Sequence, residues 1–97
     1  MTSMKNEIYM THHAERQSRQ RVVPPLIIDW LYQYGELVHD GHSALLYHFN
    51  KAAKRKIRRS IGSACYSGFT NMMDCYLVDV DGKVITVGHR FKRIRRN

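Results

Sequence analysis

The sequence predicts an α+β domain in which helices cover one face of a small antiparallel sheet. Asp40-Gly41 and Asp81-Gly82 predict the sheet, because each is a two-residue hairpin signal between stretches able to form strands. The helices are predicted from apolar residues that recur at helical spacing after Pro25 and again after Asn50. The expected order of elements is helix, helix, strand, strand, helix, strand, strand.

Residues 1–10 are expected to form a flexible N-terminal arm that ends in a short strand at 8–10, and residues 11–97 a single domain. Thr11 is suited to cap a polar surface helix over residues 11–21. Pro24-Pro25 ends this helix. Pro25 then begins the predicted core helix, which follows the i, i+3, i+4, i+7 pattern through Ile27, Trp30, Leu31 and Tyr34 and ends at Gly35.

The first hairpin is expected within residues 36–49, and Asn50 is the expected N-cap of a basic helix that ends at Gly62. This helix has only a narrow apolar seam, formed by Ala53, Ile57 and Ile61. We expect residues 63–73 to form a loop or a short extra turn.

The second hairpin surrounds Asp81-Gly82 and is rich in Val, Ile and Tyr, the residues typical of strands. Its last strand continues into a basic tail. Gly88 interrupts that strand where His89 and Arg90 emerge, which indicates a bulge or a close approach of a ligand to the backbone. A simple strand end is the alternative interpretation.

The formal net charge of +8 predicts an anionic partner, and nucleic acid is the commonest one. At 43% hydrophobic residues the chain can bury a core. No apolar run reaches the roughly 20 residues that span a bilayer, and "MTSMKNEIYM" lacks the apolar segment of a signal peptide. Cys65 and Cys75 have no CxxC spacing and are too few for a disulfide scaffold. We therefore expect a cytoplasmic protein with reduced thiols and no membrane partner.

Two basic segments are predicted to contact the phosphates of RNA, with DNA as the alternative. The helix after Asn50 carries six cations without an interleaved acid, and a polyanion would relieve the repulsion between like charges four residues apart. A solvated helix face is the alternative interpretation. The predicted nucleic-acid-binding residues are Lys51, Lys54, Arg55, Arg58, Arg59, Lys92, Arg93, Arg95 and Arg96.

The stretch "HAERQSRQRVV", His13 to Val23, resembles the opening of a family of small bacterial and phage-borne domains, in which Gly-Ile usually stands where this chain has Val22-Val23. "FNKAAKRKIRRSIG" and "DGKVITVGHRFKRIRR" resemble the basic helix and closing hairpin of relatives in that group. Such domains are often grouped with RelE-like toxins and other small metal-independent ribonucleases. The resemblance, which covers most of the chain, implies a RelE- or barnase-like α+β ribonuclease fold.

A metal-independent ribonuclease needs a base for the 2′-OH proton, cations for the phosphorane charge and an acid for the leaving 5′-oxygen. Histidine serves as acid or base near neutral pH, and arginine matches two phosphate oxygens. His89 and Arg90 supply both types on one strand end, while His13 and Arg16 share a helix face. These four are the predicted catalytic residues, provided that the first helix packs near the last strand. Glu15, on another face of that helix, is a weaker candidate for the base.

Each assignment has a structural alternative. His12 and His13 can be read as solvated residues at a helix start, and Tyr66 and Tyr76 either stack on a base or simply pack. The scatter of His39, His42 and His48 does not match a zinc site, so no metal is expected. The sequence contains no phosphate-cradling glycine loop, GxSxG elbow or paired-carboxylate pattern, and we expect no cofactor.

Two function classes remain. One is a small endoribonuclease that acts as a toxin with an acidic antitoxin or immunity protein as its partner. The other is a non-catalytic nucleic-acid-binding or anti-defence protein of a phage or mobile element. Histidines at the strand end favour the first class, whereas the number of arginines is compatible with both.

Overall fold

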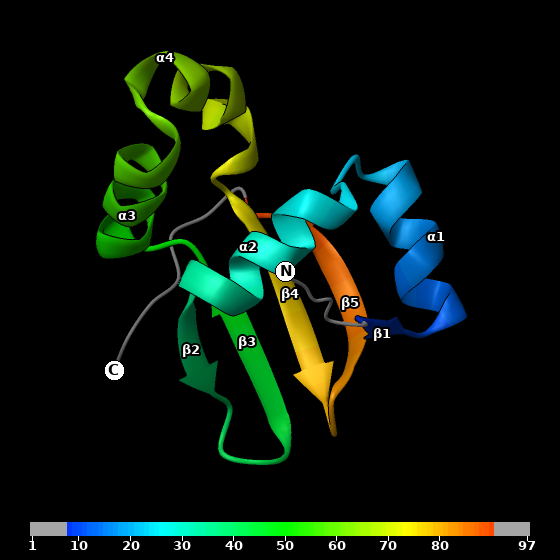
Figure 1. Ribbon diagram of the computed structural model, residues 1–97. Helices are drawn as coiled ribbons and strands as arrows, with labels where there is room; N and C mark the ends of the chain where they lie inside the picture. Colours follow the sequence, from blue (N-terminus) through cyan, green and yellow to red (C-terminus); the bar gives the residue numbers. More distant parts are fainter. Residues whose placement is uncertain (1–7, 91–97) are drawn as a thin grey trace.

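The computed structural model describes residues 8–90 and confirms the predicted α+β fold, with a five-stranded sheet (Figure 1). In chain order the elements are β1 (Tyr9–Met10), α1 (His12–Gln20), α2 (Pro25–Tyr34), β2 (Glu36–His39), β3 (Ala44–His48), α3 (Lys51–Ile61), α4 (Ser63–Tyr66), the 3-10 helix η1 (Ser67–Met72), β4 (Cys75–Val80) and β5 (Lys83–His89). Among residues 8–90, no helix combines the length and apolar character needed to cross a lipid bilayer.

The strand order in the sheet is β1-β5-β4-β3-β2. The four strands of the two hairpins pair antiparallel, as predicted, but β1 pairs parallel with β5 and makes the sheet mixed. The strand expected at the end of the N-terminal arm is therefore confirmed at Tyr9–Met10. Thr11 follows it directly, and its backbone N–H donates to Val84 O of β5 while its hydroxyl caps α1 by accepting from Ala14 N at 3.1 Å.

The two hairpin turns differ. Asp81 and Gly82 form the expected two-residue turn, and their φ angles of 54° and 83° give both residues the left-handed conformation of a type I′ hairpin. The two-residue turn expected at Asp40-Gly41 is wrong, because residues 40–43 all lie between β2 and β3. There Asp40 Oδ1 accepts from His42 N at 2.7 Å, so the aspartate stabilises a wider loop.

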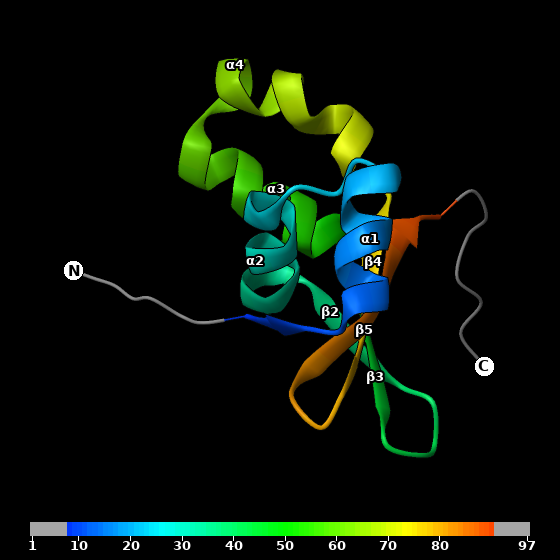
Figure 2. The same cartoon turned by 90° about the vertical axis from the view of Figure 1, so that its right-hand side faces the viewer.

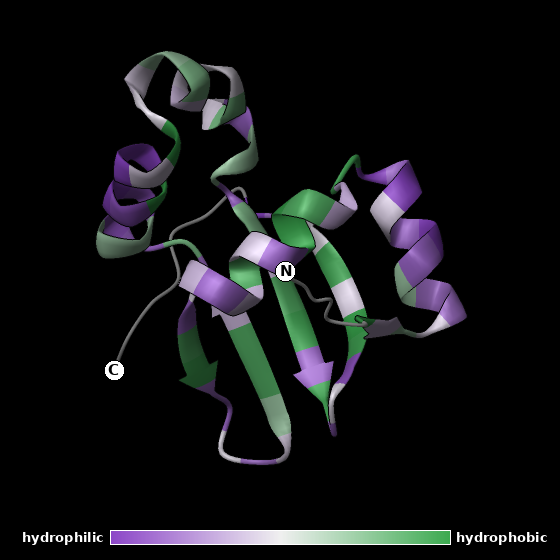
Figure 3. Cartoon of the chain, in the orientation of Figure 1, coloured by the Kyte–Doolittle hydropathy of each residue, from purple (hydrophilic) through white to green (hydrophobic). Residues whose placement is uncertain are grey.

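The core lies between the sheet and the helices on one of its faces. Burial alternates along β4, where Cys75, Leu77 and Asp79 are buried and the residues between them are partly exposed. Helix α2 crosses this face, and the turned view of Figure 2 places α2 and α3 on the same side of the strands. Ile27, Ile28 and Leu31 of α2 are almost fully buried, which confirms the predicted core helix. The central strands beneath α2 are largely hydrophobic (Figure 3).

Helix α3 is capped as predicted, because the Asn50 side chain accepts from Ala53 N at 2.7 Å. Ala53 and Ile57 of its apolar seam are buried, and its other faces are hydrophilic (Figure 3). Residues 63–72, expected as a loop or a short extra turn, are helical and form α4 and η1. Phe69 of η1 meets Trp30 edge-to-face, with ring centroids 5.1 Å apart, and this contact joins the segment to the core.

Candidate functional site

Four strand ends meet at one end of the sheet. Glu36 begins β2, His48 ends β3, Tyr76 lies near the start of β4 and Gly88 near the end of β5. They are successive cross-strand neighbours, so they form one row across the sheet, here called the end row. Directly opposed residues of antiparallel strands project to the same face, and the end row therefore gathers residues that are far apart in the sequence.

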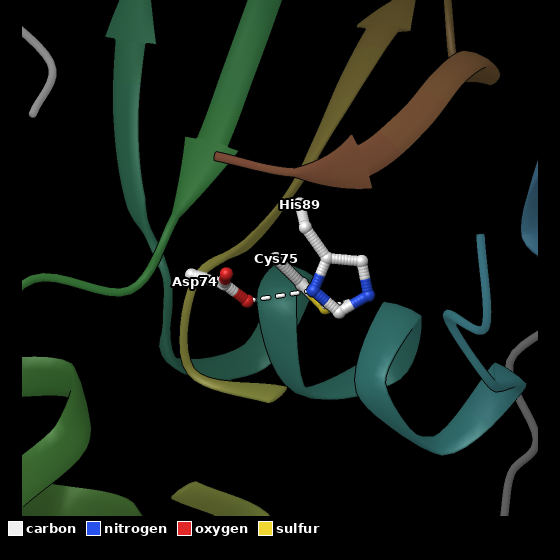
Figure 4. Close-up of side chains that lie close together, drawn as sticks. All are labelled: Asp74, Cys75 and His89. Carbon is white, nitrogen blue, oxygen red and sulfur yellow. Dashed lines mark hydrogen bonds and ion pairs between the residues drawn. The ribbon is translucent and has the colours of Figure 1, made fainter. Parts of the chain in front are cut away.

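His89 follows the end row and lies beside Asp74, the residue before β4 (Figure 4). Its Nδ1 is 2.7 Å from Asp74 Oδ1. The backbone holds the pair in place, because Arg90 N donates to Asp74 O at 2.7 Å. The His89 side chain is 19% exposed and that of Asp74 is 44% exposed, so the pair is ordered by the hairpin and still reachable from solvent.

The second ring nitrogen of His89 points to the chain between α1 and α2. Nε2 lies 3.2 Å from the backbone oxygen of Val22. A carboxylate and a carbonyl are both acceptors, so both ring nitrogens must carry a proton to satisfy them. Burial lowers the pKa of His89, but the hydrogen bond and charge of Asp74 and the bond to Val22 outweigh it and raise the pKa above its ordinary value. The geometry is that of an imidazolium.

Val22 has a backbone conformation that is uncommon for its type. Its φ is +53°, in the left-handed region, which costs roughly 1–2 kcal/mol for an L-residue. The neighbouring contacts hold it there, because Val23 is fully buried and its oxygen accepts from Ser18 Oγ at 2.6 Å. Glycine is the residue best suited to this conformation. The strained peptide is also the one whose oxygen accepts from His89.

Cys75 lies beneath the His89 ring (Figure 4), with Sγ at 3.7 Å from Nδ1 and 3.8 Å from Nε2. These nearly equal distances do not resemble a nucleophile–base pair, in which the sulfur faces one nitrogen. Burial, with a smaller contribution from the charge of Asp74, raises the pKa of the Cys75 thiol to about 12. Cys75 is a protonated core residue and not a nucleophile.

The ligand atoms of Asp74, Cys75 and His89 lie within 4.8 Å of one another, close enough to surround one small metal ion. Within residues 8–90 these three side chains form the group of potential metal ligands that lie this close together, and the sequence did not predict it. A metal would require the Cys75 thiolate, which its raised pKa opposes, and would displace the proton that joins His89 to Asp74.

Gly88 does not form the expected bulge. It stays paired with Tyr76, and the register shift lies between Val78 and Asp79. A Cβ at Gly88 would lie 3.1 Å from Arg21 Nη1 and 3.1 Å from a ring carbon of Tyr76, closer than most Cβ contacts. The close approach that the glycine permits is thus made by two side chains of the protein itself.

Helix α1 packs against β5 through residues other than those predicted. Gln17 Oε1 accepts from Val87 N at 3.0 Å, and Arg21 Nη1 donates to Val87 O at 3.0 Å. The packing of the first helix on the last strand, the condition for the predicted site, is therefore met. His13 and Arg16 are exposed on α1, and their convergence with His89 and Arg90 stays a prediction. Glu15, the weaker candidate for the base, is also exposed.

Arg90 reaches the end row and contacts a second histidine. Its Nη1 lies 3.4 Å from His48 Nδ1, and His48 Nε2 lies 3.0 Å from Glu36 Oε1. Arginine only donates, so Nδ1 must be the acceptor and the proton of His48 must sit on Nε2, facing the carboxylate. The Arg90 contact therefore fits a neutral imidazole with its proton on Nε2, which lies near the Glu36 carboxylate.

The predicted phosphate-binding residues fall into two groups. Lys51, Arg55, Arg58 and Arg59 are exposed on α3, and Lys54 is partly exposed there. Lys92, Arg93, Arg95 and Arg96 lie outside the described residues. Arg90 is the last described residue before that part of the chain.

Sequence reasoning missed Asp74, Arg21 and the His48–Glu36 pair. A signal for Asp74 existed, because counting outward from Asp81-Gly82 in a regular hairpin places it opposite His89. The irregularity at Val78/Asp79 shifts the register so that Cys75 takes this position and Asp74 lies one residue beyond. No comparable signal existed for Arg21, which was one of several arginines in a polar helix.

Comparison with known proteins adds no assignment: no family model, no curated protein and no solved structure matches this chain. The family resemblance of the sequence stays a prediction.

Proposed function

We propose that the protein is a metal-independent endoribonuclease that cleaves RNA by attack of the 2′-oxygen on the neighbouring phosphorus. The observation that carries this proposal is the pair of imidazoles at one end of the sheet. Asp74 and the Val22 carbonyl hold His89 in the doubly protonated form, whereas the contact with Arg90 favours the neutral form of His48. Environments that separate the protonation states of two groups supply an acid and a base at the same pH.

His89 is the acid of this proposal. Its imidazolium protonates the leaving 5′-oxygen as the bond from phosphorus to that oxygen breaks, and the products are a 2′,3′-cyclic phosphate and a 5′-hydroxyl. Asp74 is a positioning residue, because it orients the ring and stabilises its charge at a distance of 2.7 Å. Release of the proton leaves His89 neutral until solvent protonates it again.

His48 is the base that the contacts support. Its Nδ1 lone pair is directed at Arg90, and a phosphate is the group that would draw this guanidinium away. Nδ1 could then take the 2′-OH proton, while Glu36 stabilises the imidazolium that forms. Register places the Cα atoms of His48 and Gly88 two strand spacings apart, about 10 Å. His89 follows Gly88 and pairs with Cys75 on the core face of the sheet, so the side chains of the two histidines lie on opposite faces, and a phosphate would meet both imidazoles only beyond the ends of β3 and β5.

Cations offset the charge that develops on the phosphorane. Arg90 contacts His48, and Arg21 lies over Gly88, so both guanidinium groups border the end row. His13 and Arg16, exposed on α1, are candidates for contacts with the flanking nucleotides. We further propose a cytoplasmic toxin that an acidic antitoxin or immunity protein would neutralise, in keeping with the net charge of +8.

One observation favours the alternative, a non-catalytic nucleic-acid-binding protein of a phage or mobile element. The cations of α3 stand on the surface, so a polyanion can contact them without any rearrangement. His48 is only 5% exposed, so the protein must rearrange before RNA can reach it.

Incubation of the purified protein with a structured RNA in EDTA separates the two functions. The ribonuclease should give fragments ending in 2′,3′-cyclic phosphate, and an RNA with 2′-O-methyl groups throughout should stay intact because its 2′-oxygen cannot attack. If the unmodified RNA is bound but never cut, the binding function holds instead. Cleavage that depends on added metal would contradict the mechanism.

A further inference from the structure

A cationic hollow lies between α3 and α4, apart from the end row. Its volume is about 250 Å³, and its lining residues are Lys51, Lys54, Arg55, Arg58 and Tyr66. In Figure 1, α4 stands at the C-terminal end of α3. Tyr66, the last residue of α4, lines the hollow together with the α3 cations. We propose that this hollow is a nucleotide subsite, in which a base of single-stranded RNA stacks on Tyr66 while the α3 cations bind the phosphates beside it.

The four cations converge because of their spacing. Positions 51, 54, 55 and 58 follow the i, i+3, i+4, i+7 pattern, which puts them on one face of α3. The opposite seam, Ala53 and Ile57, is buried in the core and fixes which face is outward. In the described part of the chain no ion pair involves an α3 side chain. A hollow lined by four cations and no acid therefore favours an anion.

Tyr66 adds an aromatic ring to the cationic lining of the hollow. The ring is partly buried and packs against the hydrophobic core, so its position is fixed while part of it lines the hollow. A held aromatic ring beside cations is the arrangement by which single-stranded nucleic acids are bound, with bases on the ring and phosphates on the cations. An acidic peptide would satisfy the cations equally well but would give the tyrosine no role.

The hollow is also within reach of the proposed catalytic end of the sheet. His48, which contacts Arg90, is three residues before Lys51, so their Cα atoms are at most about 11 Å apart. An RNA strand could therefore run from the end row along the start of α3 to Tyr66. The inference rests on the proposed function for its ligand, but binding at the hollow can be measured without cleavage.

The test uses 2′-O-methyl oligonucleotides of about six residues, which the proposed reaction cannot cut, and measures affinity by fluorescence anisotropy. One probe carries all its bases, and a second has the same phosphates with abasic sites. The wild type should bind the first probe more tightly, and Tyr66→Leu should weaken that binding by about fivefold or more. The same substitution should leave the affinity for the abasic probe unchanged, and Tyr66→Phe, which keeps the ring, should behave as the wild type.

Circular dichroism and the unfolding midpoint show whether Tyr66→Leu folds, and photocrosslinking of a 5-iodouridine probe to the wild type maps the contact without any substitution. Crosslinking at Tyr66 supports the subsite. Equal binding of the two probes, or crosslinks only to other residues, overturns it. Tighter binding of an oligoglutamate peptide of matched charge, with displacement of the RNA probe, would show a protein-binding surface instead. None of these outcomes depends on catalysis, whose failure would appear separately as uncut RNA.

Discussion

Replacing Arg55 and Arg58 by glutamine should reduce the salt dependence of RNA binding by a calculable amount. Four cations line the hollow between α3 and α4. If each neutralises one phosphate of a single strand, they contribute about −2.8 to the log–log slope, at about −0.7 per contact. Affinity at this surface should then fall by about 50-fold between 50 and 200 mM salt. Removing two of the four cations should lower the slope by about 1.4.

Exposed cations outside the hollow provide a matched control. Lys56 of α3 and Lys83 of β5 are exposed and do not line the hollow. A Lys56→Gln/Lys83→Gln variant loses two charges and should keep a slope close to that of the wild type, because only direct phosphate contacts release counterions. Anisotropy titrations of a labelled oligonucleotide at five salt concentrations measure both variants. Equal slopes in the two variants would refute localised binding at the hollow and indicate a diffuse electrostatic effect.

Three further predictions concern the fold and the His89 pair. Val22→Gly should raise the free energy of unfolding in urea by up to about 1 kcal/mol, because relief of left-handed strain exceeds the entropic cost of glycine; a loss of stability would contradict the assigned conformation. Trp30→Ala should lower the free energy of unfolding by about 3–5 kcal/mol, because loss of the buried ring leaves a cavity. Gln33→Ala, at an exposed position of the same helix, should lower it by under about 0.5 kcal/mol. Equal unfolding midpoints for the two variants would mean that the core is misplaced. Asp74→Asn should lower the pKa of His89 in an NMR titration, and an unchanged midpoint would rule out the ion pair. Since that pKa is raised in the folded state above its ordinary 6.5, the pair's contribution to stability should be complete below about pH 6.5 and lost as the pH rises through the folded-state pKa. Asp74→Asn should reduce this dependence, because the backbone contact with Val22 remains.

The elements of the fold could be predicted because their signals are local. Asn50 and Thr11 are caps, Asp81-Gly82 is a tight turn, and the apolar spacing after Pro25 defines a core helix; each acts within a few residues, and each is confirmed. The wider loop at Asp40 was missed because the same Asp-Gly pair is compatible with more than one turn length. Its side chain stabilises the longer loop by accepting from His42 N.

The candidate site could be predicted only in part, because its geometry depends on register and on packing between distant segments. His89 and Arg90 were expected, since an imidazole and a guanidinium at a strand end are visible in the sequence. Asp74 depends on a register shift at Val78/Asp79, and His48 on pairing across β4. Arg21, which follows α1, could not be distinguished in the sequence from the arginines within that helix, because its contact with Val87 depends on how the helix packs. Contacts between such distant segments leave no pattern of fixed residue spacing in the sequence.

Single-turnover cleavage of RNA in EDTA decides whether His89 is the acid of a metal-independent cleavage. His89→Ala should lower the rate at saturating protein by about 10²–10⁴-fold, as expected for one acid–base group, with RNA affinity nearly unchanged. His42→Ala, which removes an exposed histidine from the β2–β3 loop, should cut at the wild-type rate. A wild type that binds RNA without cutting it, or a His89→Ala variant that cuts equally fast, would contradict the account.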